Sequence, residues 1–169
     1  MKVLPPRKIL IVLLVSFLIV GCSGKERQVD KAVKATVSAF RYEALQPNTE
    51  AGLIKVYLPE NFKIEEEHAN NLILESGNQA YILFVNPNEN GDSSLLFLTA
   101  KDQQTHYLVL ESFQTDDKFG FISIMELSEG KYELAVGSGG VKMTTETGTE
   151  NLKKEAEKMM KIVSSVPQK

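Results

Sequence analysis

Histidine and cysteine, the ligands of most zinc sites, are scarce in this 169-residue chain. The chain contains two histidines, His68 and His106, and a single cysteine. The densest group of donors is Glu65-Glu66-Glu67-His68, but neighbouring side chains of an extended segment point to opposite faces. At most two of these four side chains converge, whereas a protein zinc site uses three or four ligands. We therefore predict a solvated strand end here, and neither a metal nor another cofactor.

A second segment rich in oxygen ligands, from Asn86 to Phe97, has the length of a calcium-binding loop. Oxygen-bearing side chains alternate along it, and Gly91 stands at its sixth position. The first position, however, is Asn86, and the twelfth is Phe97, where a bidentate glutamate is required. The pair Asn90-Gly91 suits the positive φ angles of a tight hairpin turn. We expect a hairpin loop and no calcium site.

No spacing in the sequence defines a catalytic site. Gly137-Ser138-Gly139-Gly140 differs from the G-x-S-x-G nucleophile elbow and precedes a predicted strand instead of a helix. It also lacks the lysine and the serine or threonine that end a Walker phosphate loop. The 22 acidic residues form many pairs, but an acid/base pair needs a defined separation across a cleft. The five tyrosines, Tyr81 among them, are expected to be half-buried sheet residues, and we assign no catalytic residue.

The single cysteine follows a hydrophobic N-terminal segment. Residues 1–8 carry three basic side chains and no acid, and residues 9–20 contain one polar residue. Twelve residues of helix extend about 18 Å, which is shorter than the ~30 Å hydrocarbon core of a bilayer. A basic segment followed by an apolar segment of this length is typical of a secretory signal peptide.

The residues that end this segment, Ile19-Val20-Gly21-Cys22, resemble the lipobox of bacterial lipoproteins, with isoleucine where leucine is usual. In that family a signal peptidase cuts before the cysteine, whose thiol carries a diacylglycerol group. The resemblance implies signal-peptidase recognition by Ile19, Val20 and Gly21, and attachment of palmitate or similar acyl chains at Cys22. Such chains, at about 0.8 kcal/mol per buried methylene, hold a protein firmly on a bilayer.

Two other interpretations of the N-terminal segment stay open, an uncleaved signal anchor and a chance cysteine after an apolar run. The short apolar segment disfavours the anchor. The lipoprotein interpretation divides the chain into a signal peptide (1–21), a short tether (22–28) and a single extracytoplasmic α+β domain (29–169). It places the protein on the extracytoplasmic face of a bacterial membrane, with the lipidated Cys22 as its anchor.

Charge is distributed unevenly along the chain. Removal of residues 1–21 would leave sixteen basic and 22 acidic residues, a net charge of −6. An acidic protein lacks the basic surface that binds nucleic acid, so we predict no nucleic-acid partner. Basic residues nevertheless outnumber acidic ones between 25 and 43, and cations near an anionic bilayer gain about 1 kcal/mol each. Two interpretations of Lys31, Lys34 and Arg41 stay open, a contact with the membrane surface and a solvated helix with ordinary salt pairs.

Hydrophobic periodicity predicts the elements that follow. Apolar residues at helical spacing predict a helix from Val29 to Leu45, which ends before Pro47. Between Gly52 and Thr145, short segments separated by turn residues predict strands. We place these strands at Leu53–Leu58, Phe62–Glu66, Asn71–Glu75, Ala80–Val85, Leu95–Ala100, Thr105–Phe113, Phe121–Leu127, Lys131–Val136 and Val141–Thr145.

A second helix is predicted from Asn151 to Ser165, with Glu155 and Lys158 outside its apolar stripe. This order of elements indicates the α+β class, in which an antiparallel sheet carries an N-terminal and a C-terminal helix on one face. The turn Tyr57-Leu58-Pro59-Glu60-Asn61-Phe62 resembles the entry to the sheet in the PsbP-like family of extracytoplasmic proteins. That resemblance implies a curved antiparallel sheet and a final helix, and it transfers no functional residue.

A firm anchor, a small domain and the lack of a catalytic motif together predict a non-enzymatic protein of the bacterial cell envelope. We expect a binding or regulatory module whose partner is an unidentified envelope protein. The alternatives are an envelope hydrolase with acid/base carboxylates on its sheet and a carrier of a small ligand. Two buried carboxylates facing each other across a cleft would favour the hydrolase, and an apolar cavity between sheet and helices would favour the carrier.

Overall fold

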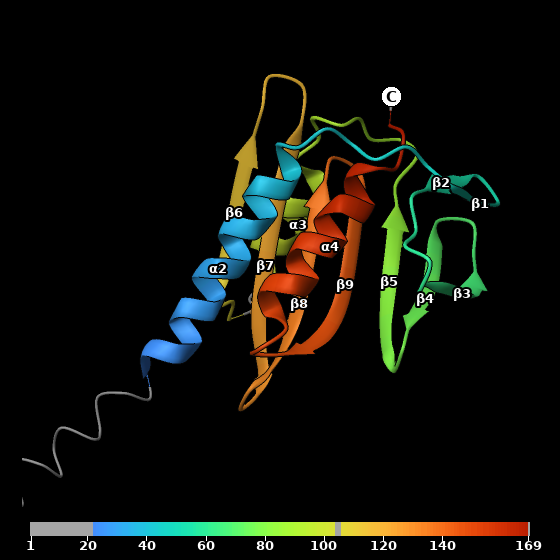
Figure 1. Ribbon diagram of the computed structural model, residues 1–169. Coiled ribbons are helices and arrows are strands. Elements are labelled where there is room, and N and C mark those ends of the chain that lie inside the picture. Colours follow the sequence, from blue (N-terminus) through green and yellow to red (C-terminus); the bar gives the residue numbers. More distant parts are fainter. Residues whose placement is uncertain (1–21, 104–105, 169) are drawn as a thin grey trace, which may run out of the picture.

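The computed structural model describes residues 22–103 and 106–168, and its main element is a seven-stranded antiparallel sheet (Figure 1). The strand order is β3-β4-β5-β9-β8-β7-β6, and the short strands β1 and β2 form a separate hairpin. The helices are α2 (Cys22–Phe40), α3 (Leu95–Asp102) and α4 (Leu152–Ser164). The strands are β1 (Thr49–Ala51), β2 (Ile54–Val56), β3 (Lys63–Glu67), β4 (Asn71–Ser76), β5 (Gln79–Val85), β6 (Val109–Gln114), β7 (Phe119–Ser128), β8 (Lys131–Ser138) and β9 (Val141–Gly148).

The helices α2 and α4 pack beside each other on one face of the sheet, and α3 lies on the opposite face (Figure 1). The predicted α+β class, with an N-terminal and a C-terminal helix on an antiparallel sheet, is confirmed. None of the described helices is long and apolar enough to cross a membrane.

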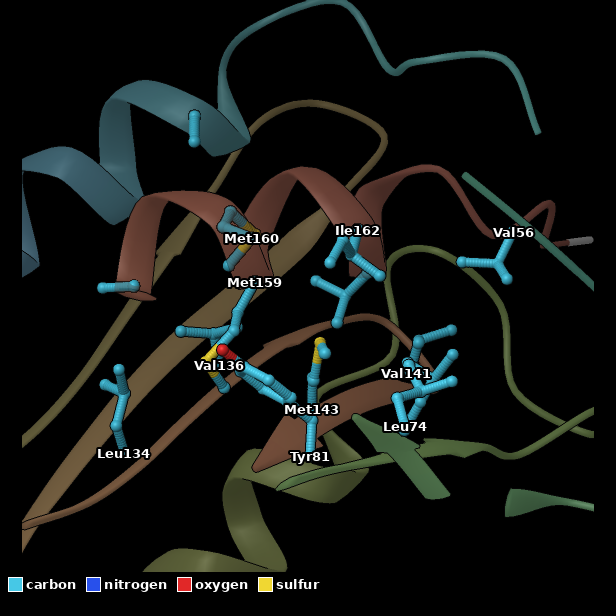
Figure 2. Close-up of a cluster of buried hydrophobic side chains, with 14 of the residues drawn as sticks. Val56, Leu74, Tyr81, Leu134, Val136, Val141, Met143, Met159, Met160 and Ile162 are labelled. Atoms are coloured by element: carbon cyan, nitrogen blue, oxygen red, sulfur yellow. The ribbon is translucent and has the colours of Figure 1, made fainter. Parts of the chain in front are cut away.

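The hydrophobic core lies between α4 and the sheet. Figure 2 shows Met159 and Ile162 of α4 above Met143, which comes from β9. All residues of this core cluster lie between Ala32 and Val166, so the segment 22–169 contains the complete core that the structure describes. Burial of apolar side chains at about 25 cal/mol per Å² is the main favourable term that holds the helices on the sheet.

Helix α2 begins earlier than predicted. It starts at Cys22 instead of Val29, so residues 22–28 form the first turns of a helix and not the short tether that we expected before the domain. The ammonium group of Lys25 pairs with the carboxylate of Glu126 on β7, and this contact attaches the first turns to the sheet. The pairing partner lies 101 residues away, so no local pattern indicated it.

Helix α2 also ends earlier than predicted, at Phe40 and not at Leu45. The Phe40 ring packs against the ring of Phe113 on β6, with 4.9 Å between their centres. Both rings lie against Gly120 of β7, where an added Cβ would come within 2.8 Å of the Phe40 ring. The close approach of helix and sheet at this point therefore depends on the missing side chain of a glycine.

Replacing Gly120 by alanine is expected to lower the free energy of unfolding by about 1–3 kcal/mol, because the new methyl group overpacks the core. Urea unfolding followed by circular dichroism measures the loss. Adding Phe113→Leu should restore part of it, since the smaller side chain vacates the space. The control is Gly24→Ala on α2, where no atom lies within 4 Å and alanine improves helix propensity. Equal stability of wild type and Gly120→Ala would contradict the close packing.

Most predicted strands agree with the structure. The strands β3, β4, β5, β7, β8 and β9 lie within three residues of their predicted bounds, and α4 within one residue. The segment predicted at Leu53–Leu58 contains only the short strand β2, which Gly52 joins to β1 with a φ of 55°. The edge strand β6 begins at Val109, whereas the predicted strand begins at Thr105.

One predicted strand is wrong, because Leu95–Ala100 belongs to the helix α3. The Phe97 ring packs against Phe119 and Phe121 of β7, with 5.7 and 6.1 Å between ring centres, and this contact fixes the helix on the sheet. The Asn90-Gly91 pair consequently does not connect a hairpin, since a helix follows it and β5 pairs with β9. A short apolar run alone does not distinguish a strand from a helix.

Candidate functional site

The predicted anchor stands at the start of the folded domain. Cys22 is the first residue of α2, whereas Ile19, Val20 and Gly21 lie outside the described residues. Helix α2 then runs along the sheet beside α4 (Figure 1). A group attached to Cys22 would therefore be joined to the domain by the helix itself. Lipid attachment and signal-peptidase recognition stay predictions.

The three cations predicted to contact a membrane differ in their environment. Lys31, Lys34 and Arg41 are all exposed. Lys34 donates to the carboxylate of Asp30 at 2.7 Å, one turn earlier on α2, and this pair offsets its charge. In the part of the chain that the structure describes, Lys31 and Arg41 have no carboxylate at ion-pair distance. They therefore keep their positive charge available to an external anion.

A buried polar cluster joins α4 to β5, and the sequence patterns did not reveal it. Tyr81 Oη donates to Glu155 Oε2 at 2.8 Å. Lys158 Nζ donates to Tyr81 Oη at 2.8 Å and lies 2.6 Å from the same Glu155 oxygen. Tyr81 is 1% exposed and Glu155 5%, so the predictions of a half-buried tyrosine and of an outward glutamate are wrong. Glu155 stands at helical spacing from Met159 and Ile162, but the sequence did not show which group would satisfy a carboxylate in a buried position.

The surroundings of Tyr81 keep its phenol protonated. Burial raises the pKa of Tyr81 well above its usual value, and the hydrogen bond to Glu155 and the charge of Glu155 raise it further. The phenol therefore stays protonated and donates to the carboxylate. The Lys158 ammonium lies 4.9 Å from the centre of the Tyr81 ring and 5.3 Å from that of Phe62, which is cation–π distance. Because the three groups satisfy one another, the cluster holds α4 on the sheet and offers no activated nucleophile.

On the surface, residues of both α2 and α4 line two recesses. The larger, of about 520 Å³, includes Ala35 and Ala39 of α2 in its lining. The smaller, of about 430 Å³, is where Lys31 of α2 meets Lys153 and Lys154 of α4. The predicted membrane-contact residue Lys31 is thus brought beside two lysines that follow it by more than 120 positions.

The remaining groups that the sequence singled out do not assemble into a metal site. Among the described residues, no group of three or more histidine, cysteine, aspartate or glutamate side chains is able to hold a metal ion. His68 lies 3.2 Å from the carboxylate of Glu66, and both side chains are exposed. In the segment that resembles a calcium loop, the carboxylate of Glu89 accepts a hydrogen bond from the hydroxyl of Ser93.

These features define an α+β domain in which two helices cover one face of an antiparallel sheet, with a Tyr–Glu–Lys cluster between the layers. No family model matches the chain, and no curated protein matches it. The resemblances to bacterial lipoproteins and to PsbP-like domains accordingly stay predictions that rest on the residues quoted above.

Proposed function

We propose that this protein is a bacterial lipoprotein that is anchored through Cys22 on the extracytoplasmic face of a membrane and serves the cell envelope as a non-enzymatic binding or regulatory module. The observation that carries the proposal is the order of the N-terminal segment. Basic residues come first, an apolar segment with a single polar residue (9–20) follows, and Ile19-Val20-Gly21-Cys22 stands at its end. The start of α2 at Cys22 supports it, because an anchored domain would then lie directly at the membrane.

The packing of the domain favours a binding module over the two alternatives. Among the described residues, Glu155 is the one buried carboxylate, and its neighbours are Tyr81 and Lys158 instead of a second acid. This arrangement argues against an acid/base pair of the glycosidase kind. Buried side chains of α4 and of the sheet lie in one core cluster (Figure 2), which argues against a carrier cavity at that place. The proposed partners are the membrane and an envelope protein.

Replacing Cys22 by alanine is expected to abolish labelling by an alkyne analogue of palmitate and to leave residues 1–21 attached to the chain. The reason is that the thiol is the acyl acceptor and its modification precedes cleavage in the lipoproteins that the sequence resembles. In-gel detection of the label and the intact mass of the protein measure both effects. The control is Ser23→Ala, one position further on, which should keep the label and the shorter mass. A Cys22→Ala protein that is still shortened and still fractionates with membranes would contradict the proposal.

A further inference from the structure

We infer that the outer surface of α2 and α4 docks on an anionic phospholipid bilayer, with Lys31, Lys153 and Lys154 at the centre of the contact. We call residues 22–43 and 152–164 the helix layer. The inference rests on the proposed function and deepens it, since it names the surface that the anchored domain turns toward its membrane.

The first observation is that the two layers of the domain carry opposite charge. The helix layer contains nine basic and five acidic residues, a net charge of +4. Residues 44–151, which contain both sheets, α3 and their loops, have six basic and seventeen acidic residues, a net charge of −11. Because α2 and α4 pack beside each other, two basic segments far apart in the sequence form one face (Figure 1). An anionic bilayer attracts this face and repels the rest of the domain.

The second observation is local. Lys31, Lys153 and Lys154 line one recess of about 430 Å³ between the helices. In residues 22–103 and 106–168, none of these three ammonium groups has a carboxylate at ion-pair distance. All three side chains are exposed. Phosphate oxygens of lipid headgroups are the anions that such a group of free ammonium ions attracts.

Two glutamates also line this recess, and they weaken its field only in part. The carboxylate of Glu157 is already engaged by Lys161, which lies 2.7 Å away. Glu150 accepts a hydrogen bond of 3.4 Å from the amide of Asn151. With Glu157 paired, one carboxylate stands against three ammonium groups, and the recess keeps a positive charge.

The third observation is the distance to the anchor. Lys31 lies nine residues after Cys22 on the same helix, about 14 Å along its axis at 1.5 Å per residue. Acyl chains on Cys22 and the lysines of the helix layer are therefore able to reach one bilayer when α2 lies along its surface. An acidic protein, or the acidic sheet of a second copy, would match the same charge. The bilayer is favoured because the anchor keeps it within this distance at all times.

The experiment uses residues 22–169 with Cys22→Ser, because this segment contains the complete described core and needs no lipid. Flotation with vesicles of phosphatidylcholine and phosphatidylglycerol should show binding that decreases with added salt, and vesicles of phosphatidylcholine alone should show none. In the test variant, Lys31, Lys153 and Lys154 are all changed to Gln. Its partition coefficient should fall about 100-fold, since each lysine contributes about 1 kcal/mol.

The matched control removes the same charge outside the helix layer, by changing Lys63, Lys101 and Lys142 to Gln. It should change binding less than about threefold, because Lys63 on β3, Lys142 on β9 and Lys101 on α3 do not belong to the face that meets the bilayer. Equal loss in both variants would overturn the inference, because net charge alone would then explain binding. Failure of the parent domain to bind the mixed vesicles at low salt would overturn it as well. So would a dimer in sedimentation that the helix-layer variant dissociates, which would assign the face to a second copy. If the wild-type chain carried no alkyne label while residues 22–169 still bound the vesicles, the proposed anchor would be refuted and this surface would not.

Discussion

Replacing Glu155 by alanine is expected to lower the free energy of unfolding by about 3–5 kcal/mol, because the change leaves Lys158 without its counter-ion in a site that is largely shielded from water. The side chains of Glu155 and Lys158 are only 6% and 20% exposed. The same change removes the acceptor of the Tyr81 hydroxyl, which is itself buried. Urea unfolding followed by far-ultraviolet circular dichroism measures the loss.

The matched control is Glu157, two residues further along the same helix. Glu157 pairs with Lys161 at 2.7 Å, but these side chains are 41% and 44% exposed. Exposed ion pairs contribute about 1 kcal/mol or less, so Glu157→Ala should cost less than that. A combined Glu155→Gln and Lys158→Met variant should recover much of the loss, because it removes the charge with its partner. Similar losses for Glu155→Ala and Glu157→Ala would mean that the cluster is not shielded as the structure has it.

The contrast between these two glutamates explains why the sequence did not reveal the cluster. Both residues belong to a charged stretch of one helix, and the amphipathic pattern of a helix predicts that charged residues lie on its solvated side. The position of Glu155 is decided by Tyr81, which lies 74 residues earlier on β5. A buried carboxylate needs a partner of this kind, and only the tertiary structure brings the two together. The alternating strands β4, β5, β7, β8 and β9 were predictable, because their signal is contained in each segment.

The same reasoning applies to the predicted site. The pattern around Cys22 is local, so the sequence alone was sufficient to predict a lipid anchor there. Lys31 was also named from the sequence, but its neighbours Lys153 and Lys154 were not, since their proximity depends on the packing of α2 against α4. The strand predicted at Leu95–Ala100 was wrong because its local pattern was ambiguous. Its apolar residues fit both a strand and a helix, and the contact of Phe97 with β7 selects the helix.

The two faces of the sheet are expected to respond differently to truncation on β5. Leu83 is fully buried on the face that α2 and α4 cover, where it belongs to the core, whereas Ile82 is 50% exposed on the opposite face. Leu83→Ala should lower the free energy of unfolding by about 2–5 kcal/mol, because it removes buried methyl groups and leaves a cavity. The register places Leu83 opposite Leu72 on β4 and Met143 on β9, and both would border that cavity.

The control, Ile82→Ala, changes the neighbouring residue of the same strand and should cost less than about 1 kcal/mol, since its side chain is already half in water. Urea unfolding of residues 22–169 measures both losses under the same conditions. Together they test which face of β5 is core, and hence which surface the domain leaves for an envelope partner when the helix layer faces the membrane. Equal losses would mean that Ile82 is covered in the protein in solution, and the outer face of the sheet would then not be available to a partner.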